Sequence, residues 1–214
     1  MLERRTKIIV WSFLLGIIVI EGTALAMVFR ARHGGWFSAL AHYAATPMGN
    51  LAAWCLAALV TVVYCAYAAR RSSTIGALML HPERWRPYLA VRVVAIPMAL
   101  ISGLFEETFF RRVLMDVALA HGASIAAQIA LSAVIFGAAH AIWAVFGGWR
   151  AALGAMIATT TLGFCLAVAY VVGGRALAPC IAAHIAINLL LEPWLIITAA
   201  TNDWNRYGPR TTSS

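Results

Sequence analysis

The sequence predicts an all-α fold: a polytopic membrane bundle of about six transmembrane helices. Of the 214 residues, 63% are hydrophobic and only 11% are charged. Soluble domains carry about a quarter charged residues, and the deficit here fits a lipid environment, in which charged side chains are costly. Six mostly apolar stretches follow one another along the chain, and each reaches the length of about 20 residues that a helix needs to cross a bilayer.

These apolar stretches set the expected boundaries of the transmembrane helices. The third stretch is too long for one straight span perpendicular to the membrane. Pro97 lies within it and Pro179 lies near the start of the sixth, so both predict local bends or helix starts. The six expected helices are Ile8–Phe29, Gly49–Ala69, Leu89–Leu119, Ser124–Phe146, Ala151–Val172 and Ala176–Ala200.

Residues 1–88 are expected to form two transmembrane helices and a basic interfacial linker. The first helix contains Ala24-Leu25-Ala26, which resembles a signal-peptidase site, but its apolar run continues to Phe29, so we expect the helix to be retained. Glu21, in the same helix, has no assigned role. The linker Arg70–Tyr88 mixes charged residues with Leu and Trp and fits either an amphipathic segment at the membrane surface or a basic loop.

The net charge of +8 is better explained by membrane topology than by nucleic acid, because the basic residues form no face interleaved with aromatic residues. Cytoplasmic segments carry an excess of Lys and Arg, and these residues also contact anionic lipid head groups. Both termini are therefore expected in the cytoplasm. The cytoplasmic set is Arg4, Arg5, Lys7, Arg70, Arg71, Arg84, Arg86, Arg150, Arg206 and Arg210, and the opposite side has mainly Arg30, Arg32 and Arg175.

The third helix contains adjacent carboxylates, Glu106 and Glu107, in an apolar setting. Such groups need partners or a water-filled cavity. Glu107 and Arg111 are four residues apart, so they lie on one helix face and can form a structural pair. Glu106 is rotated by roughly 100° from Glu107 and is expected to be a free carboxylate. The alternative is that these charges only mark a helix end at the membrane surface.

The fourth and sixth helices contribute the other candidate residues. His140 is the only ionisable residue between Ser124 and Phe146, and Phe136 lies four residues before it. His184 and Asn188 share one face of the sixth helix. The same face carries Cys180 and Glu192, and the fifth helix has a stripe of small residues suited to close helix packing. This stripe consists of Ala151, Ala155, Thr159, Gly163 and Ala167.

Together these side chains suit the hydrolysis of an amide bond by water. Glu106 can act as the base, and His140 can help to orient the water. His184 and Asn188 can donate hydrogen bonds to the oxyanion of a tetrahedral intermediate. A protein nucleophile is absent from the set, and water can replace it. The sequence thus indicates an enzyme whose catalytic residues are Glu106, His140, His184 and Asn188.

Three alternatives stay open. Glutamate and histidine side chains can bind zinc, although the HExxH signature is absent, so we expect no metal cofactor and keep zinc as the second option. A transporter, immunity or scaffold protein can use the same buried polar cluster, for example to relay protons. A Cys180–His184 dyad has the spacing for contact, but this cysteine lies in an apolar helix.

The four cysteines are expected to act as small hydrophobic residues: Cys55, Cys65, Cys165 and Cys180.

The three motifs resemble those of the CAAX protease and bacteriocin-processing family, also called the Abi family or type II CAAX prenyl endopeptidases. In order along the chain, the motifs are Glu106-Glu107-x-x-x-Arg111, Phe136-x-x-x-His140 and His184-x-x-x-Asn188. The resemblance covers roughly Leu89 to Leu191. This chain departs from the family in having Arg112 where a glycine usually follows the arginine of the first motif.

The resemblance implies an intramembrane glutamic peptidase in which Glu106 and His140 activate water and His184 and Asn188 stabilise the oxyanion. Glu107, Arg111 and Phe136 would support the site. The expected substrate is a membrane-anchored, prenylated or C-terminal-signal-bearing protein or peptide. The expected location is the inner membrane of a bacterial or archaeal cell. Residues 89–200 would form the catalytic four-helix core and residues 201–214 a polar tail, within one integral membrane domain.

Overall fold

A computed structural model describes residues 3–35, 38–39 and 48–204, and this part of the chain is helical without a strand. Six of its helical segments are long and apolar enough to cross a membrane, which confirms the predicted fold class. Their bounds are Arg4–Arg32, Leu51–Arg71, Pro82–Ala120, Ile125–Phe146, Gly148–Val172 and Ala178–Thr201. Residues 205–214 of the predicted tail lie outside the described residues.

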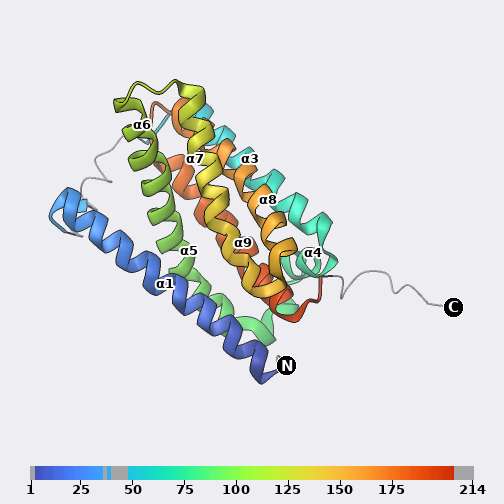
Figure 1. The fold of residues 1–214 in the computed structure, drawn as a ribbon. Helices are drawn as coiled ribbons and strands as arrows, with labels where there is room; N and C mark the ends of the chain where they lie inside the picture. The colour runs from blue at the N-terminus through green and yellow to red at the C-terminus, as the bar shows by residue number, and fades with distance from the viewer. Residues whose placement is uncertain (1–2, 36–37, 40–47, 205–214) are drawn as a thin grey trace.

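The helices run up and down the bundle, and α1 lies along its outside against α5 (Figure 1). The start of α1 and the end of α9 are at the same end of the bundle, as six spans require. The elements are α1 (Arg4–His33), α3 (Leu51–Arg71), α4 (Ser73–Leu80), η1 (Pro82–Tyr88), α5 (Leu89–Glu107), η2 (Thr108–Met115), α6 (Asp116–Ala120), α7 (Ile125–Ala139), η3 (His140–Trp143), α8 (Ala144–Val172) and α9 (Ala178–Thr201).

Side-chain caps fix where α3, α4 and α7 begin. The side chains of Asn50, Ser72 and Ser124 each accept a hydrogen bond from a backbone N–H in the first turn of the helix that follows, which satisfies a donor that has no partner within the helix. Asn50 Nδ2 also donates to the Val172 carbonyl at 2.8 Å. The start of α3 is therefore tied to the end of α8.

The predicted linker between the second and third spans is helical and packed, so the basic-loop alternative is wrong. It forms α4 and η1. Ile75 and Leu78 of α4 are 1% exposed, and the Trp85 indole donates to the Leu78 carbonyl. The Ser72 hydroxyl donates to the Trp204 carbonyl at 2.6 Å. The linker thus packs over the end of α9 and is not a loop exposed on all sides.

The third span, which the sequence indicated to be too long for one straight perpendicular helix, consists of more than one kind of helix. It passes without a break through Pro97, and then changes from α5 to the π-helix η2 directly after Glu107. Wider π turns occur mainly inside α-helices at functional sites. Here the Phe110 carbonyl in the π segment accepts a hydrogen bond from the Ser132 hydroxyl of α7 at 3.1 Å, so tertiary contact with α7 supports the altered winding.

Two glycines allow close approach of the helices that build the site. A Cβ atom at Gly137 of α7 would lie 2.8 Å from the Met156 carbonyl oxygen of α8, and one at Gly103 of α5 would lie 2.5 Å from the Ile185 side chain of α9. Small residues permit such contacts in membranes, where packing drives helix association. Gly163 of the predicted small-residue stripe faces Phe136 of α7, in agreement with a packing role.

Candidate active site

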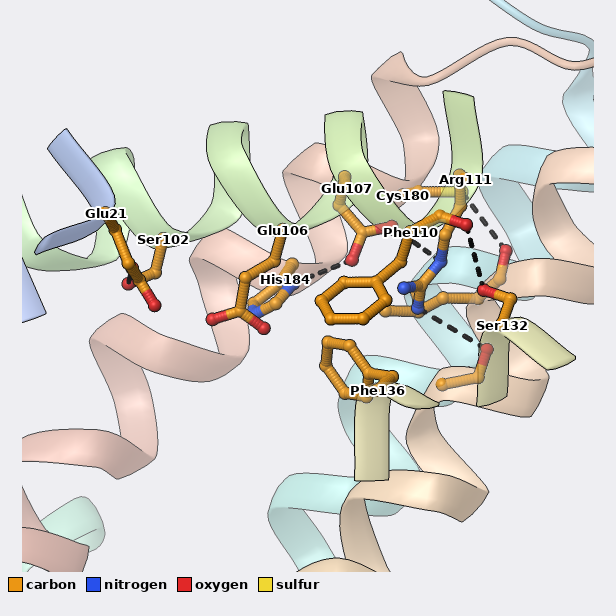
Figure 2. Close-up of polar contacts among 12 residues, drawn as sticks. Glu21, Ser102, Glu106, Glu107, Phe110, Arg111, Ser132, Phe136, Cys180 and His184 are labelled. Carbon is orange, nitrogen blue, oxygen red and sulfur yellow. Dashed lines mark hydrogen bonds and ion pairs between the residues drawn. The ribbon is translucent and has the colours of Figure 1, made fainter. Parts of the chain in front are cut away.

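Charged and polar side chains from four elements meet inside the bundle: α1, α5 with its continuation η2, α7 and α9 (Figure 2). Three segments far apart in the sequence, around Glu106, Phe136 and His184, thereby become neighbours. The ring centres of Phe136 and His184 are 5.8 Å apart, and His184 contacts both glutamates of α5. The structure thus gathers the first-motif glutamates with residues of the other two motifs.

Glu107 and Arg111 form the predicted pair. Arg111 Nε lies 3.0 Å from Glu107 Oε2, and both side chains are 0% exposed. The contact is a charge pair without the alignment of a good hydrogen bond. Because a buried charge without a partner is very costly, the fold depends on each of these groups to hold the other. This geometry supports the expected structural role of the pair.

Further contacts help to hold the Arg111 guanidinium inside the bundle. Arg111 Nη2 donates to the Gly163 carbonyl of α8 at 3.4 Å. The guanidinium carbon lies 4.8 Å from the ring centre of Phe136 and 6.0 Å from that of Phe110, where the electron-rich ring faces attract a cation. Phe136 therefore supports Arg111 as well as the two histidines.

His184 lies between the two glutamates of α5. Its Nδ1 is 2.7 Å from Glu107 Oε1, and its Nε2 is 4.0 Å from Glu106 Oε2. An ionised carboxylate accepts hydrogen bonds only, so Nδ1 carries the proton and donates a hydrogen bond to Glu107. This bond fixes the ring and turns Nε2 toward Glu106. The contact with Glu107 adds a role for that residue beyond its pairing with Arg111.

His140 is held by its own helix. Its Nδ1 is 2.8 Å from the Phe136 carbonyl oxygen, which can only accept, so Nδ1 is the donor and Nε2 is left for other partners. The ring centre lies 4.8 Å from that of Phe136. Phe136 is fully buried and contacts both histidine rings, which spaces them apart within one site.

A cavity of about 370 Å³ opens beside these residues. His140, His184 and Asn188 are on its wall, together with Glu192. Glu106 is not among the lining residues. It lies behind His184, which lines the cavity and whose Nε2 is 4.0 Å from Glu106 Oε2. Much of the remaining wall is apolar or aromatic, with Arg71 and Arg150 among its polar members. An apolar cavity with a few convergent polar groups is the usual form of a ligand site.

Two carboxylates that had no assigned role also belong to this region. Glu21 of α1 accepts a hydrogen bond from the Ser102 hydroxyl of α5, and its carboxyl group points toward that of Glu106 (Figure 2). Glu192 lines the cavity, and its Oε2 is buried without a hydrogen-bond partner among the described residues. Glu106 is therefore not the isolated carboxylate that the helical rotation suggested. A charge within an apolar helix was the sequence signal for both.

Other polar residues of the sequence lie outside the site. Asp116, which is four residues from Arg112, instead pairs with Arg175 Nη2 at 2.7 Å and accepts a hydrogen bond from the Tyr170 hydroxyl at 3.2 Å. The Cys180 thiol donates to the Leu166 carbonyl at 3.3 Å. In the described ranges, no three His, Cys, Asp or Glu side chains gather in a way that would hold a metal ion.

Comparison with known proteins gives one match. Residues 88–190 match the family model described as Type II CAAX prenyl endopeptidase Rce1-like. No curated protein and no solved structure matches the chain. The matched residues run from just before α5 into α9 and include all seven residues of the three motifs. Glu21 and Glu192 lie outside the matched range.

Proposed function

We propose that this chain is an intramembrane glutamic endopeptidase, because residues 88–190 match the family model described as Type II CAAX prenyl endopeptidase Rce1-like. It hydrolyses a peptide bond near the membrane in a lipidated or membrane-anchored protein or peptide. This match and the six possible membrane spans support a multi-pass membrane protease of the CAAX type. The chemistry is proposed from the site itself, and it uses water without a metal ion.

One observation supports this chemistry most directly: His184 is held between Glu107 and Glu106 on the wall of a cavity. Glu107 fixes the ring through Nδ1, so the opposite nitrogen faces Glu106. A carboxylate and an imidazole 4.0 Å apart can together handle the proton of an attacking water. The nearby aromatic walls can bury apolar parts of a substrate.

In the proposed reaction, Glu106 takes a proton from water with the help of His140, and the oxygen attacks the carbonyl carbon of the substrate. His184 and Asn188 stabilise the oxyanion. Because Nδ1 of His184 already donates its hydrogen bond to Glu107, only Nε2 can serve the substrate, and it donates when the ring carries both protons. The proton held by Glu106 then passes to the leaving amine as the C–N bond breaks.

Replacing Asn188 by Ala is expected to lower kcat by about 100-fold or more, the usual cost of one oxyanion donor. KM is expected to change little, because the hydrogen bond forms mainly in the transition state. Both constants are measured on a cleaved peptide with detergent-purified protein. Asn188 lines the cavity and is only partly buried, so the variant is expected to fold. A rise in KM at unchanged kcat would contradict the oxyanion role.

The proposed function is tested by offering the purified protein a panel of prenylated and membrane-anchored peptides, with mass spectrometry of the products. We expect cleavage of at least one class at a single peptide bond, equally in the presence and absence of a chelator. The class that is cleaved defines the substrate. Unprenylated and soluble versions of the same peptides serve as controls for the need of a membrane anchor.

The other outcomes lead to different conclusions. Activity that is lost with the chelator and restored by zinc would replace the metal-free mechanism by a metalloprotease. Failure to cleave any peptide, in protein shown to be folded, would favour a transport, immunity or scaffold function for the same buried residues.

A further inference from the structure

Glu21 lies in the part of the chain that the family match does not reach, yet its carboxyl group faces the proposed catalytic base. It is on α1, whereas the matched residues 88–190 begin just before α5. In Figure 2 the carboxyl groups of Glu21 and Glu106 point toward one another from these two helices.

Ser102 fixes Glu21 in this place. Ser102 and Glu106 are four residues apart on α5, so their side chains share one helix face. The Ser102 hydroxyl, 2% exposed, donates to Glu21 Oε2. The helices are close here, since a Cβ atom at Gly22 would be in ordinary contact with Ile101 at 3.8 Å. Glu21 is thus anchored one helical turn from Glu106, on the face that α1 covers.

Two carboxyl groups can form a hydrogen bond only if one of them keeps a proton, because an ionised carboxylate has no donor. Like charges also disfavour the ionisation of both groups when they share a site. The side chain of Glu106 is only 12% exposed, so water screens this repulsion little. We therefore expect these two facing carboxyl groups to hold one proton between them.

The surroundings of the pair are consistent with a single shared proton. From α9, His184 approaches Glu106 and Glu192 adds a further carboxylate. From α5, Glu107 is already neutralised by its ion pair with Arg111. Glu106 Oε2 is buried and has no hydrogen-bond partner among the described residues. It is the atom that faces His184, so a second proton, taken from water, can bind there.

We propose that Glu21 is a positioning residue for the reaction and shares one proton with Glu106 in the resting enzyme. The inference rests on the proposed function. Glu106 accepts a proton from water at Oε2 while the shared proton stays between the two glutamates. The hydroxide oxygen bonds to the carbonyl carbon, and the C–N bond then breaks as one proton moves from the pair to the amine nitrogen. The pair returns to its single shared proton.

The test is Glu21→Gln, which keeps the size of the side chain and a hydrogen bond to Ser102 but removes the acid. We expect kcat to fall about 10-fold or more and KM to stay within about twofold, because Glu21 acts through Glu106 and not on the substrate. The profile of kcat/KM against pH is expected to move along the pH axis, since interacting acids titrate as a pair. Glu83→Gln, at an exposed carboxylate of η1, is the control and should leave both unchanged.

A second measurement does not need activity. Infrared spectra of the protein in lipid vesicles, recorded over a range of pH, follow the carboxyl groups that keep a proton. Glu21→Gln and Glu106→Gln are each expected to change the titration of the glutamate that remains, and Glu83→Gln is expected to change neither.

These two readouts separate the possible failures. If Glu21→Gln leaves the infrared titration of Glu106 unaltered, no proton is shared and the inference is wrong. If the titration changes but kcat and the pH profile equal those of the wild type, Glu21 is not a positioning residue. If the wild type cleaves no peptide, the proposed function fails, and the infrared titration alone then decides whether the proton is shared.

Discussion

Glu106→Gln is expected to lower kcat by about 10³-fold or more while the protein remains folded, because general acid–base groups contribute about 10²–10⁴-fold to catalysis. Glutamine has nearly the same size and can still donate a hydrogen bond to Glu21. Its amide oxygen cannot take a proton from water. The loss should therefore fall on the chemical step and leave KM almost unchanged.

The measurement is single-turnover cleavage of the best peptide from the panel, with the folded state of the variant checked by its elution and thermal unfolding. Glu83→Gln is again the matched control, since it removes one carboxylate at an exposed position of η1. Wild-type rates in folded Glu106→Gln protein would exclude Glu106 as the base. His140, whose Nε2 is free of its own helix, would then be the next candidate.

The transmembrane spans could be predicted from the sequence because the requirement is one-dimensional: an apolar run must match the thickness of the bilayer. The pair of Glu107 and Arg111 was predictable for a similar reason, since a spacing of four places two residues on one helix face. The contact of 3.0 Å between the two side chains follows that rule. Neither prediction required knowledge of which helices are neighbours.

Contacts between helices could not be predicted in this way. The sequence does not reveal that a hydrogen bond from Nδ1 to Glu107 orients the His184 ring. It also does not reveal that α1 brings Glu21 to Ser102. The π-helix after Glu107 also lacks a sequence signal, because one of its carbonyls is satisfied by Ser132 of another helix. Glu21 was visible as a charge in an apolar helix, but its partner depends on how α1 packs on α5.

These contacts change what the motif residues are expected to do. Read as a motif, Glu107 and Arg111 support the shape of the site. In the structure, Glu107 connects the buried guanidinium to the His184 ring. Polar side chains therefore follow one another from Ser102 and Glu21 past Glu106 and His184 to this ion pair, and in the proposed mechanism they link stability to catalysis.

The buried pair gives the second large expected effect. Arg111→Met should lower the free energy of unfolding by about 3–5 kcal/mol, because it leaves Glu107 without its cation, and Glu107→Gln should cost a similar amount by leaving Arg111 unpaired. Each substitution nearly keeps the volume of the side chain, so little of the loss is due to a cavity. Thermal unfolding of the protein in one detergent provides the comparison.

The double variant, Glu107→Gln with Arg111→Met, separates a charge pair from two independent effects. Its free energy of unfolding is expected to fall by much less than the sum of the two single losses. Replacing both charged groups of a buried pair by neutral groups of similar size is often nearly neutral. The Gln oxygen can still accept from His184 Nδ1, so the ring keeps its orientation. Additive losses, or single variants as stable as the wild type, would show that the ion pair does not stabilise the bundle. If the double variant recovers both stability and cleavage, Arg111 serves to hold Glu107, and Glu107 serves to hold His184.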